Sequence, residues 1–297
     1  MKFLKRLIWV GIGYFISGLL PLFASEREMI DLSAFSWNIT LDRDASWQND
    51  VLYLPPVDIR ALPVNEPTGG WKALEHPDKT GVNLPATVEE YLWGYNGQTY
   101  GVTGNYTGVS WFTTRVSVPS DWKDRRIVMK VEAVRFRAEI FVNRKLVGYD
   151  VVNSTPFGVD LSDVLVPGEE NEIAFRITDP NGNFNWKDSQ RFTWGEYLTN
   201  PSHGFGGITG SVKLEATDQI YIADVFVKNQ PDPRKIEIDM ELENAASSEI
   251  IGCPLSVEIK EHQTGKSVYR KTLPPVKMKT GLNKLTHQVR LASAQLW

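Results

Sequence analysis

The residues with the clearest potential for chemistry lie between positions 179 and 188 of this 297-residue chain. A side-chain oxygen recurs there at every second position, carried by Asp179, Asn181, Asn183 and Asn185. Oxygens at this spacing could surround a hard cation such as Ca²⁺, and the candidate ligands of a structural calcium ion are Asp179, Asn181 and Asn183. An EF-hand loop does not fit, because other residue types hold the positions of its turn Gly and its bidentate Glu.

The same segment could instead line a carbohydrate site. Amide and carboxylate groups hydrogen-bond hydroxyls, and a Trp ring packs against the apolar face of a sugar. The candidate carbohydrate-binding residues here are Asn183, Asn185, Trp186, Asp188 and Trp194. A third possibility is a cluster of Asn/Asp turns that holds no ligand.

A second segment, residues 89–108, combines glycines with aromatic residues and Asn. Glycines permit unusual backbone angles, and an Asn side chain both donates and accepts hydrogen bonds, which suits a loop that grips sugar hydroxyls. Asn96, in Tyr95-Asn96-Gly97, is the candidate contact. An Asn-Gly turn without a ligand is the alternative.

Other signatures of chemistry are missing from the sequence. It contains no G-x-S-x-G nucleophile motif and no phosphate-binding loop. His203 has no second His or Cys nearby, so we expect its ring to pack within a loop. The net charge of −4, with interspersed signs, offers no basic face, and nucleic acid is not an expected partner. Cys253 is the only cysteine, so no internal disulfide can form and a packed apolar role is predicted.

The elements that must position these residues show the two-residue period of β-strands. Ile140 and Val142 face one side and Phe141 the other, a turn follows at residues 143–145, and the chain returns to form a hairpin. The strands expected from alternation are 111–118, 127–134, 138–142, 173–178, 222–227, 236–243, 255–259 and 285–291. Residues 42–70 are expected to be loop, and no long helical period occurs between residues 25 and 220. The sequence therefore predicts an all-β protein.

The first 24 residues differ from the rest of the chain. Three basic residues precede an apolar run from Leu7 to Phe23, and Ala24 is a small residue suited to cleavage. We expect a secretory signal peptide and a secreted, periplasmic or cell-surface location. An uncleaved membrane anchor is the alternative, and it would be the only contact with a membrane.

Several motifs in one order resemble the N-terminal sugar-binding module of glycoside hydrolase family 2, which includes β-galactosidases, β-glucuronidases and β-mannosidases. The motifs lie at residues 108–122 (GVSWF followed by VPSDW), 138–177 (with VGYD, TPFGVDLSDVL and PGEENEIAFRI) and 206–214 (GGI followed by VKL). In several family members the loop that corresponds to residues 89–108 places an Asn on the sugar, and the resemblance matches Asn96 to it. Two positions depart from the family: Val88 stands where Trp is usual, and residues 200–203 lack an acid that often precedes the G-I strand.

The resemblance implies a fold and a domain order. We expect a signal peptide at 1–24 and a jelly-roll, galactose-binding-like β-sandwich at 25–219. Residues 220–297 would form an immunoglobulin-like β-sandwich that is cut short, because the family continues past the L-W at positions 296–297 with one more strand. The oligomeric state is not predicted.

In the family, the two catalytic carboxylates sit in a (β/α)₈ barrel that follows these sandwiches, and no βα alternation occurs here. We therefore expect no catalytic residue and no activity from this chain alone. The resemblance implies the non-catalytic front of a secreted β-glycosidase that binds carbohydrate, either a β-glycoside or a plant or host glycan, and shapes the rim of an active site. The alternative is a free-standing exported carbohydrate-binding or adhesion module.

Overall fold

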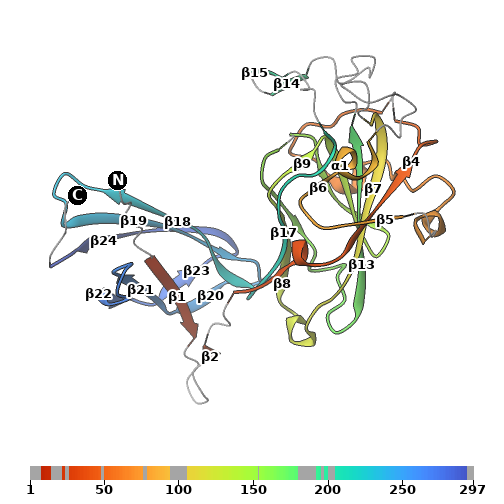
Figure 1. Ribbon diagram of the computed structural model, residues 1–297. Helices are drawn as coiled ribbons and strands as arrows, with labels where there is room; N and C mark the ends of the chain where they lie inside the picture. Colours follow the sequence, from red (N-terminus) through yellow and green to blue (C-terminus); the bar gives the residue numbers. More distant parts are fainter. Residues whose placement is uncertain are drawn as a thin grey trace. The chain divides into compact units, whose positions relative to one another are not determined.

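The computed structural model describes residues 8–14, 22–23, 27–47, 50–75, 79–93, 106–152, 154–179, 192–194, 197–199 and 205–292. For 8–14, 22–23, 192–194 and 197–199 only the backbone is described. The protein is all-β and forms two compact units (Figure 1). One unit comprises residues 28–216, and the other comprises residues 217–292 with two strands near the N-terminus.

A six-stranded antiparallel sheet with the order β11-β10-β13-β7-β4-β5 is the framework of the 28–216 unit. Its strands are β4 (Trp37–Asp42), β5 (Thr80–Val82), β7 (Gly108–Ser117), β10 (Arg137–Val142), β11 (Lys145–Asp150) and β13 (Glu170–Asp179). The predicted hairpin is confirmed, with Asn143 and Arg144 at φ 50° and 66° in the turn between β10 and β11.

A four-stranded sheet with the order β12-β8-β17-β3 provides the second layer of this unit. Its strands are β3 (Glu28–Asp31), β8 (Arg126–Val131), β12 (Phe157–Asp160) and β17 (Val212–Thr217). One apolar core joins the two sheets, including Trp37 and Phe175 from the first and Met129 and Leu214 from the second. The rings of Trp37 and Phe175 meet edge to face, with centroids 5.8 Å apart. Burial between two sheets explains the alternation in the sequence, because only every second side chain faces the core.

Short elements complete this unit. They are β6 (Ala86–Thr87), β9 (Val134–Arg135), β16 (Gly207–Ile208), the helix α1 (Val88–Leu92), and 3₁₀ turns at Leu32–Ala34, Ile59–Ala61, Trp71–Glu75 and Ser120–Trp122. The strands β14 (Phe192–Trp194) and β15 (Tyr197–Thr199) pair with each other. The Thr87 hydroxyl accepts a hydrogen bond from the Glu90 N–H and so caps α1.

The outer face of the six-stranded sheet is covered by residues 43–47 and 50–75, which we call the covering segment. Trp47 and Leu74 of this segment pack into a second apolar cluster with Trp111 and Phe141 of the sheet. Trp71 also meets the Phe141 ring, with centroids 5.2 Å apart. Apart from the 3₁₀ turns at Ile59–Ala61 and Trp71–Glu75, the covering segment has loop character, yet it buries the face of the sheet that is turned away from the main core.

The second unit holds a three-stranded antiparallel sheet of β18 (Ile220–Asn229), β19 (Lys235–Asn244) and β24 (Gly281–Arg290). Its other strands are β20 (Ile250–Cys253), β21 (Leu255–Lys260), β22 (Ser267–Thr272) and β23 (Val276–Met278). Cys253 is buried in the apolar core of this unit, which confirms its predicted packing role, and burial raises the pKa of its thiol.

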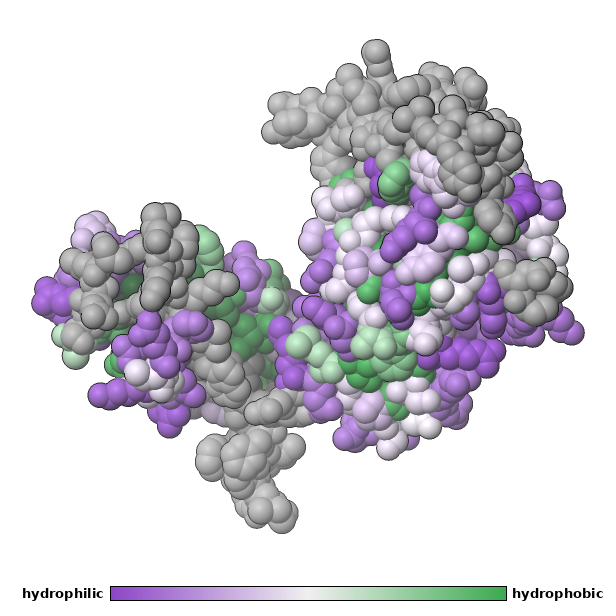
Figure 2. Space-filling view, viewed as in Figure 1, coloured by the Kyte–Doolittle hydropathy of each residue, from purple (hydrophilic) through white to green (hydrophobic). Residues whose placement is uncertain are grey.

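Near the N-terminus, β1 (Ile8–Tyr14) pairs with β21, and β2 (Leu22–Phe23) pairs with β1. The expected signal peptide falls largely outside the described residues, since 1–7, 15–21 and 24–26 are not among them. Signal function therefore stays a prediction. In the part of the chain that the structure describes, we find no helix with the length and hydropathy needed to cross a bilayer. Figure 2 shows hydrophilic residues over much of the visible surface, with small hydrophobic patches between them.

Candidate functional site

Most of the predicted site residues lie outside the described residues. These are Asn96, Asn181, Asn183, Asn185, Trp186 and Asp188. Trp194 ends β14, for which only the backbone is described. Asp179 is described: it is the last residue of β13, pairs in register with Gly108, and is 3% exposed. Carbohydrate contact by these residues stays a prediction.

The described residues that flank segments 94–105 and 180–204 meet at helix α1. The Glu89 carboxylate accepts hydrogen bonds from the Tyr106 N–H at 3.0 Å and from the Gly206 N–H at 3.1 Å. The Val88 N–H donates to the Gly206 carbonyl at 2.8 Å. Position 206 has no room for a side chain, because a Cβ would lie 2.7 Å from an Asp179 carboxylate oxygen. The Glu89 carboxylate therefore holds Tyr106 and Gly206, which follow segments 94–105 and 180–204, close to each other.

Burial changes the pKa values of Glu89 and Tyr106. It raises the pKa of Glu89, although the two N–H donors and the nearby Arg135 charge act in the opposite direction. Burial also raises the pKa of Tyr106, whose hydroxyl donates to the Val109 carbonyl at 2.8 Å. The Glu89 carboxylate thus keeps two hydrogen bonds in a site that disfavours its charge.

A calcium site gains no support from the part of the chain that is described. No group of three or more His, Cys, Asp or Glu side chains within it could hold a metal ion. Of the three candidate ligands, Asn181 and Asn183 fall outside that part, and Asp179 alone does not form a site. The calcium hypothesis stays a prediction.

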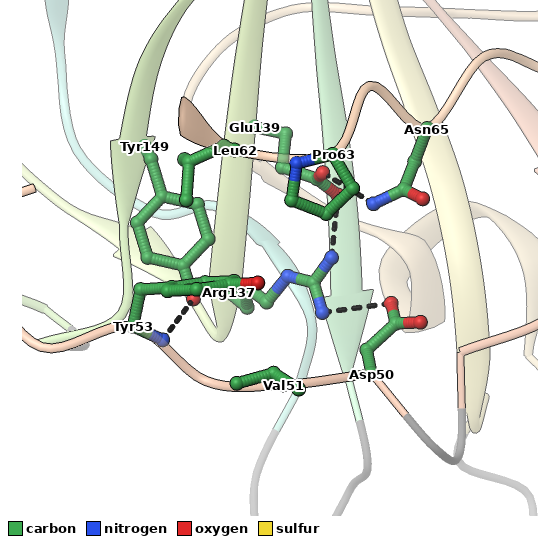
Figure 3. A pocket seen from close by; sticks show the side chains of 9 residues that line it. All are labelled: Asp50, Val51, Tyr53, Leu62, Pro63, Asn65, Arg137, Glu139 and Tyr149. Carbon is green, nitrogen blue, oxygen red and sulfur yellow. Dashed lines mark hydrogen bonds and ion pairs between the residues drawn. The ribbon is translucent and has the colours of Figure 1, made fainter. Parts of the chain in front are cut away.

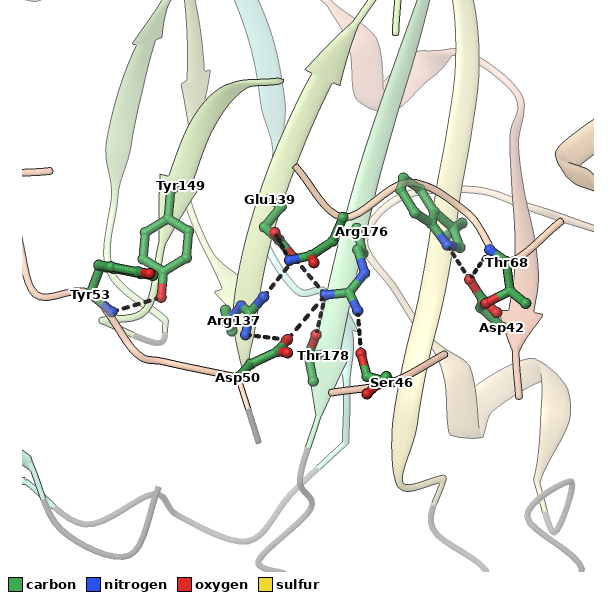
Figure 4. Close-up of polar contacts among 12 residues, drawn as sticks. Asp42, Ser46, Asp50, Tyr53, Thr68, Arg137, Glu139, Tyr149, Arg176 and Thr178 are labelled. Atoms are coloured by element: carbon green, nitrogen blue, oxygen red, sulfur yellow. Dashed lines mark hydrogen bonds and ion pairs between the residues drawn. The ribbon is translucent and has the colours of Figure 1, made fainter. Parts of the chain in front are cut away.

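A network of four charged side chains, three of them buried and Asp50 half-buried, lies between the six-stranded sheet and the covering segment (Figure 4). Arg137 donates to Asp50 at 2.8 Å and to Glu139 at 2.9 Å. Arg176 donates to the same Glu139 oxygen at 2.5 Å and lies 3.8 Å from Asp50. Two guanidinium groups therefore face two carboxylates, and the network is electrically balanced.

Further hydrogen bonds fasten the covering segment over this network. Asn65 donates to the second Glu139 oxygen at 2.7 Å, and Arg176 also donates to the Ser46 carbonyl at 3.3 Å. Burial alone would lower the pKa of Arg137, but the Glu139 carboxylate, Tyr149 and the Asp50 carboxylate together raise it. Arg137 therefore stays charged although it is 2% exposed.

The covering segment does not fill the space above the sheet, and a cavity of about 230 Å³ remains (Figure 3). Its lining consists of Asp50, Val51, Tyr53, Leu62, Pro63, Asn65, Arg137, Glu139 and Tyr149. The Tyr53 N–H donates to the Tyr149 hydroxyl oxygen at 3.1 Å, and their two rings stand nearly perpendicular, at 81°. Burial raises the pKa of Tyr149 to about 12. Figure 3 shows the Arg137 guanidinium between the carboxylates of Asp50 and Glu139, beside the Tyr149 ring.

None of the cavity residues was predicted as a site residue from the sequence. Arg137, Glu139 and Phe141 share the outward row of β10, where a large apolar residue accompanies charges. A row that mixes Phe with paired charges indicates a covered face, and this signal could have been read from the sequence. The sequence does not reveal which segment covers this face, because the residues of the covering segment lack periodicity.

Comparison with known proteins shows where this chain has relatives. Residues 98–217 match the family described as glycosyl hydrolases family 2, sugar binding domain. A β-glucuronidase of Formosa agariphila is 28% identical over 163 residues, which make up 55% of this chain and 16% of that protein. A β-galactosidase of Clostridium acetobutylicum is 25% identical over 150 residues, or 50% of this chain and 15% of that protein.

Solved structures extend the likeness in fold. A glycosyl hydrolase family 2 member from Bacteroides cellulosilyticus matches with a TM-score of 0.64 and 17% identity, covering 91% of this chain and 32% of that chain. A β-glucuronidase from glycoside hydrolase family 2 matches with a TM-score of 0.61 and 19% identity, covering 92% of this chain and 27% of that chain. The present chain therefore spans about a third or less of each relative, and at these identities the structures share its fold.

Proposed function

We propose that this chain, whose residues 98–217 belong to the sugar binding domain of glycosyl hydrolases family 2, serves as the carbohydrate-binding N-terminal part of a β-glycosidase and supplies no catalytic group. The observation that carries the proposal is the extent of the match. It occupies 16% of the β-glucuronidase and 15% of the β-galactosidase, so most of each relative has no counterpart in this chain.

The chemistry of the described carboxylates supports a non-catalytic role. A retaining glycosidase needs two carboxyl groups ~5 Å apart, one of which must donate a proton to the leaving group. Asp50 and Glu139 converge on Arg137, and Glu139 also binds Arg176. Both carboxylates are ion-paired with guanidinium groups, which favours their ionised form, so neither is suited to donate a proton to a leaving group. Glu89 is likewise engaged by two backbone N–H groups.

We also infer the finer fold classes that the family resemblance implies. Residues 28–216, with two sheets around one core, would be a galactose-binding-like jelly roll. Residues 217–292 would be an immunoglobulin-like sandwich. A crystal structure with parallel pairing between the long strands of either unit would contradict these assignments.

Hydrolysis and binding assays on the purified chain test the functional proposal. We expect no release of chromophore from aryl β-galactoside, β-glucuronide or β-mannoside, and weak binding of at least one of the parent sugars. Binding is followed by Trp fluorescence, with Trp194→Phe as a variant near the predicted contacts. Turnover that disappears on substitution of one carboxylate would refute the non-catalytic role, and the absence of binding to any sugar would refute the carbohydrate role.

We further propose that the chain is exported by way of residues 1–24, on the basis of their basic and apolar composition. The mass of the protein recovered from its native host tests this. A mature chain that begins near residue 25 is expected, and a chain of full mass in the soluble cytosolic fraction would contradict export.

A further inference from the structure

We propose that the cavity between the covering segment and strands β10 and β11 binds a single neutral sugar ring. This inference rests on the proposed carbohydrate binding and assigns it to described residues that neither the sequence nor the family match singles out. Arg137, Glu139 and Asp50 form the charged part of its lining, which we call the floor, and Tyr53, Tyr149, Leu62 and Pro63 also line it (Figure 3).

The volume of the cavity sets the size of the ligand. At about 230 Å³ it has room for roughly eight water molecules at ~30 Å³ each. It is smaller than the ~300 Å³ at which pockets for drug-sized ligands begin. One six-membered ring with its hydroxyl groups therefore fits, whereas a disaccharide would extend into solvent.

The charges at the floor favour a neutral ligand. Arg137 and Arg176 balance Asp50 and Glu139, and each of these groups already has a partner of opposite sign within 3.8 Å. A charged ligand would lose hydration without meeting an uncompensated countercharge. A neutral ligand with hydroxyl groups loses less hydration energy, and each hydroxyl can donate and accept hydrogen bonds to replace those it made with water.

Polar atoms with spare hydrogen-bonding capacity surround this space. Among the described residues, Asn65 uses only its amide nitrogen and Asp50 only one carboxylate oxygen. The Tyr149 hydroxyl accepts a bond from Tyr53 and keeps its own proton, because its pKa is about 12. The lining thus offers both donors and acceptors to one ligand.

The lining also has an apolar part. Val51, Leu62 and Pro63 supply aliphatic surface, and Tyr53 and Tyr149 supply two rings whose centroids are 6.1 Å apart. Perpendicular rings form a corner that can contact the C–H groups of a pyranose from two sides. An apolar wall with a few convergent polar groups is the general composition of small-molecule sites.

A pair of identical substitutions tests the site. Val51 and Val64 are both 56% exposed and both belong to the covering segment, but only Val51 lines the cavity. We expect Val51→Trp to fill the cavity and weaken sugar binding at least tenfold, and Val64→Trp to leave binding within twofold of wild type. Affinities are measured by calorimetric titration of the full chain with methyl glycosides of glucose, galactose, mannose and xylose, and with glucuronate as the charged counterpart.

The outcomes separate this inference from the proposed function. If wild type binds a neutral sugar and Val51→Trp binds it equally well, the cavity is not the site, although carbohydrate binding stands. Preference for glucuronate over glucose at a site that Val51→Trp blocks would overturn the neutral specificity. No binding of any sugar would overturn both. Should Val51→Trp fail to fold, Asn65→Ala removes one amide from the lining, and unchanged affinity in that variant would also exclude the cavity.

Discussion

Strands β13 and β19 both place apolar residues on an inner face and charged residues on an outer face, but the outer face is buried in β13 and solvated in β19. In β13 the inward Phe175 is fully buried and the outward Arg176 is 2% exposed. In β19 the inward Met240 is buried, whereas the outward side chains of Asp239 and Glu241 are 34% and 35% exposed. The strand pattern alone does not decide whether a charged face is solvated.

The difference arises from what lies over each face. The covering segment packs Trp47 and Leu74 onto the outer side of the six-stranded sheet, and the charges beneath it pair with one another. On β19 the acids pair instead with lysines of the neighbouring strands: Lys228 binds Asp239, and Lys284 binds Glu241 at 2.6 Å. Covered charges need fixed, mutually satisfying partners, whereas solvated charges can also rely on water.

Removing one acid from each face should give the largest contrast. Glu139→Ala leaves Arg137 and Arg176 buried without their shared carboxylate, and we expect a loss of about 3–5 kcal/mol in the free energy of unfolding. Glu241→Ala makes the same chemical change on β19, where water replaces the lost partner, and a far smaller loss is expected. Urea unfolding of both variants measures the difference.

Equal losses for the two variants would mean that the Glu139 network is hydrated in solution. In that event the covering segment would not seal the outer face, and the contrast between β13 and β19 would disappear.

The apolar contacts of the covering segment should show a smaller contrast. Leu74 is 8% exposed within the second apolar cluster, and Leu74→Ala should cost about 2–3 kcal/mol, because it removes buried methyl groups and leaves a void. Leu282, on β24, is 50% exposed, and Leu282→Ala should change the free energy of unfolding by less than about 0.5 kcal/mol. Thermal or urea unfolding compares the pair, and a destabilisation by Leu282→Ala that matches Leu74→Ala would contradict the assignment of the covered face.

The sequence was sufficient to predict most of the longer strands and their inner faces, whereas β5, β12, β22 and β23 were not expected. Ile140, Val142 and Phe175 enter the core as their period of two requires, and Phe141 faces the other way, as predicted. This success has a physical basis, because burial between two sheets imposes a strict alternation that a single strand records. Residues 161–165 form a single helical turn, in which the Leu165 N–H donates to the Leu161 carbonyl.

The candidate cavity could not be predicted in the same way. Asp50 and Asn65 belong to an aperiodic segment, and their partners Arg137 and Glu139 are 87 and 74 positions away in the sequence. No local pattern encodes which loop will cover a given strand face, since that depends on long-range packing. The residues that were predicted, from Asn96 to Trp194, were selected by residue type and spacing, and carbohydrate contact by them stays a prediction.

Buried and solvated carboxylates should also differ in their response to pH. Burial raises the pKa of Glu89 above its ordinary value of 4.5, whereas hydrogen bonds from Lys228 and Thr286 lower the pKa of Asp239 below 3.8. Between pH 4.5 and its raised pKa, folded Glu89 binds more protons than the unfolded chain does, so its contribution to the free energy of unfolding falls as the pH rises. The contribution of Asp239 is complete above pH 3.8 and is lost as the pH falls through its lowered pKa.

Glu89→Gln and Asp239→Asn should therefore remove slopes of opposite sign. We expect Glu89→Gln to cost about 1–3 kcal/mol in the free energy of unfolding at pH 7, because the amide oxygen can accept from only one of the Tyr106 and Gly206 N–H groups and the other buried donor loses its acceptor. It should also flatten the decline in stability that begins above pH 4.5. Asp239→Asn should act only at the acidic end. Urea unfolding from pH 3 to pH 7 measures both slopes, and a steeper decline in Glu89→Gln than in wild type would show that the Glu89 charge is not disfavoured by its burial.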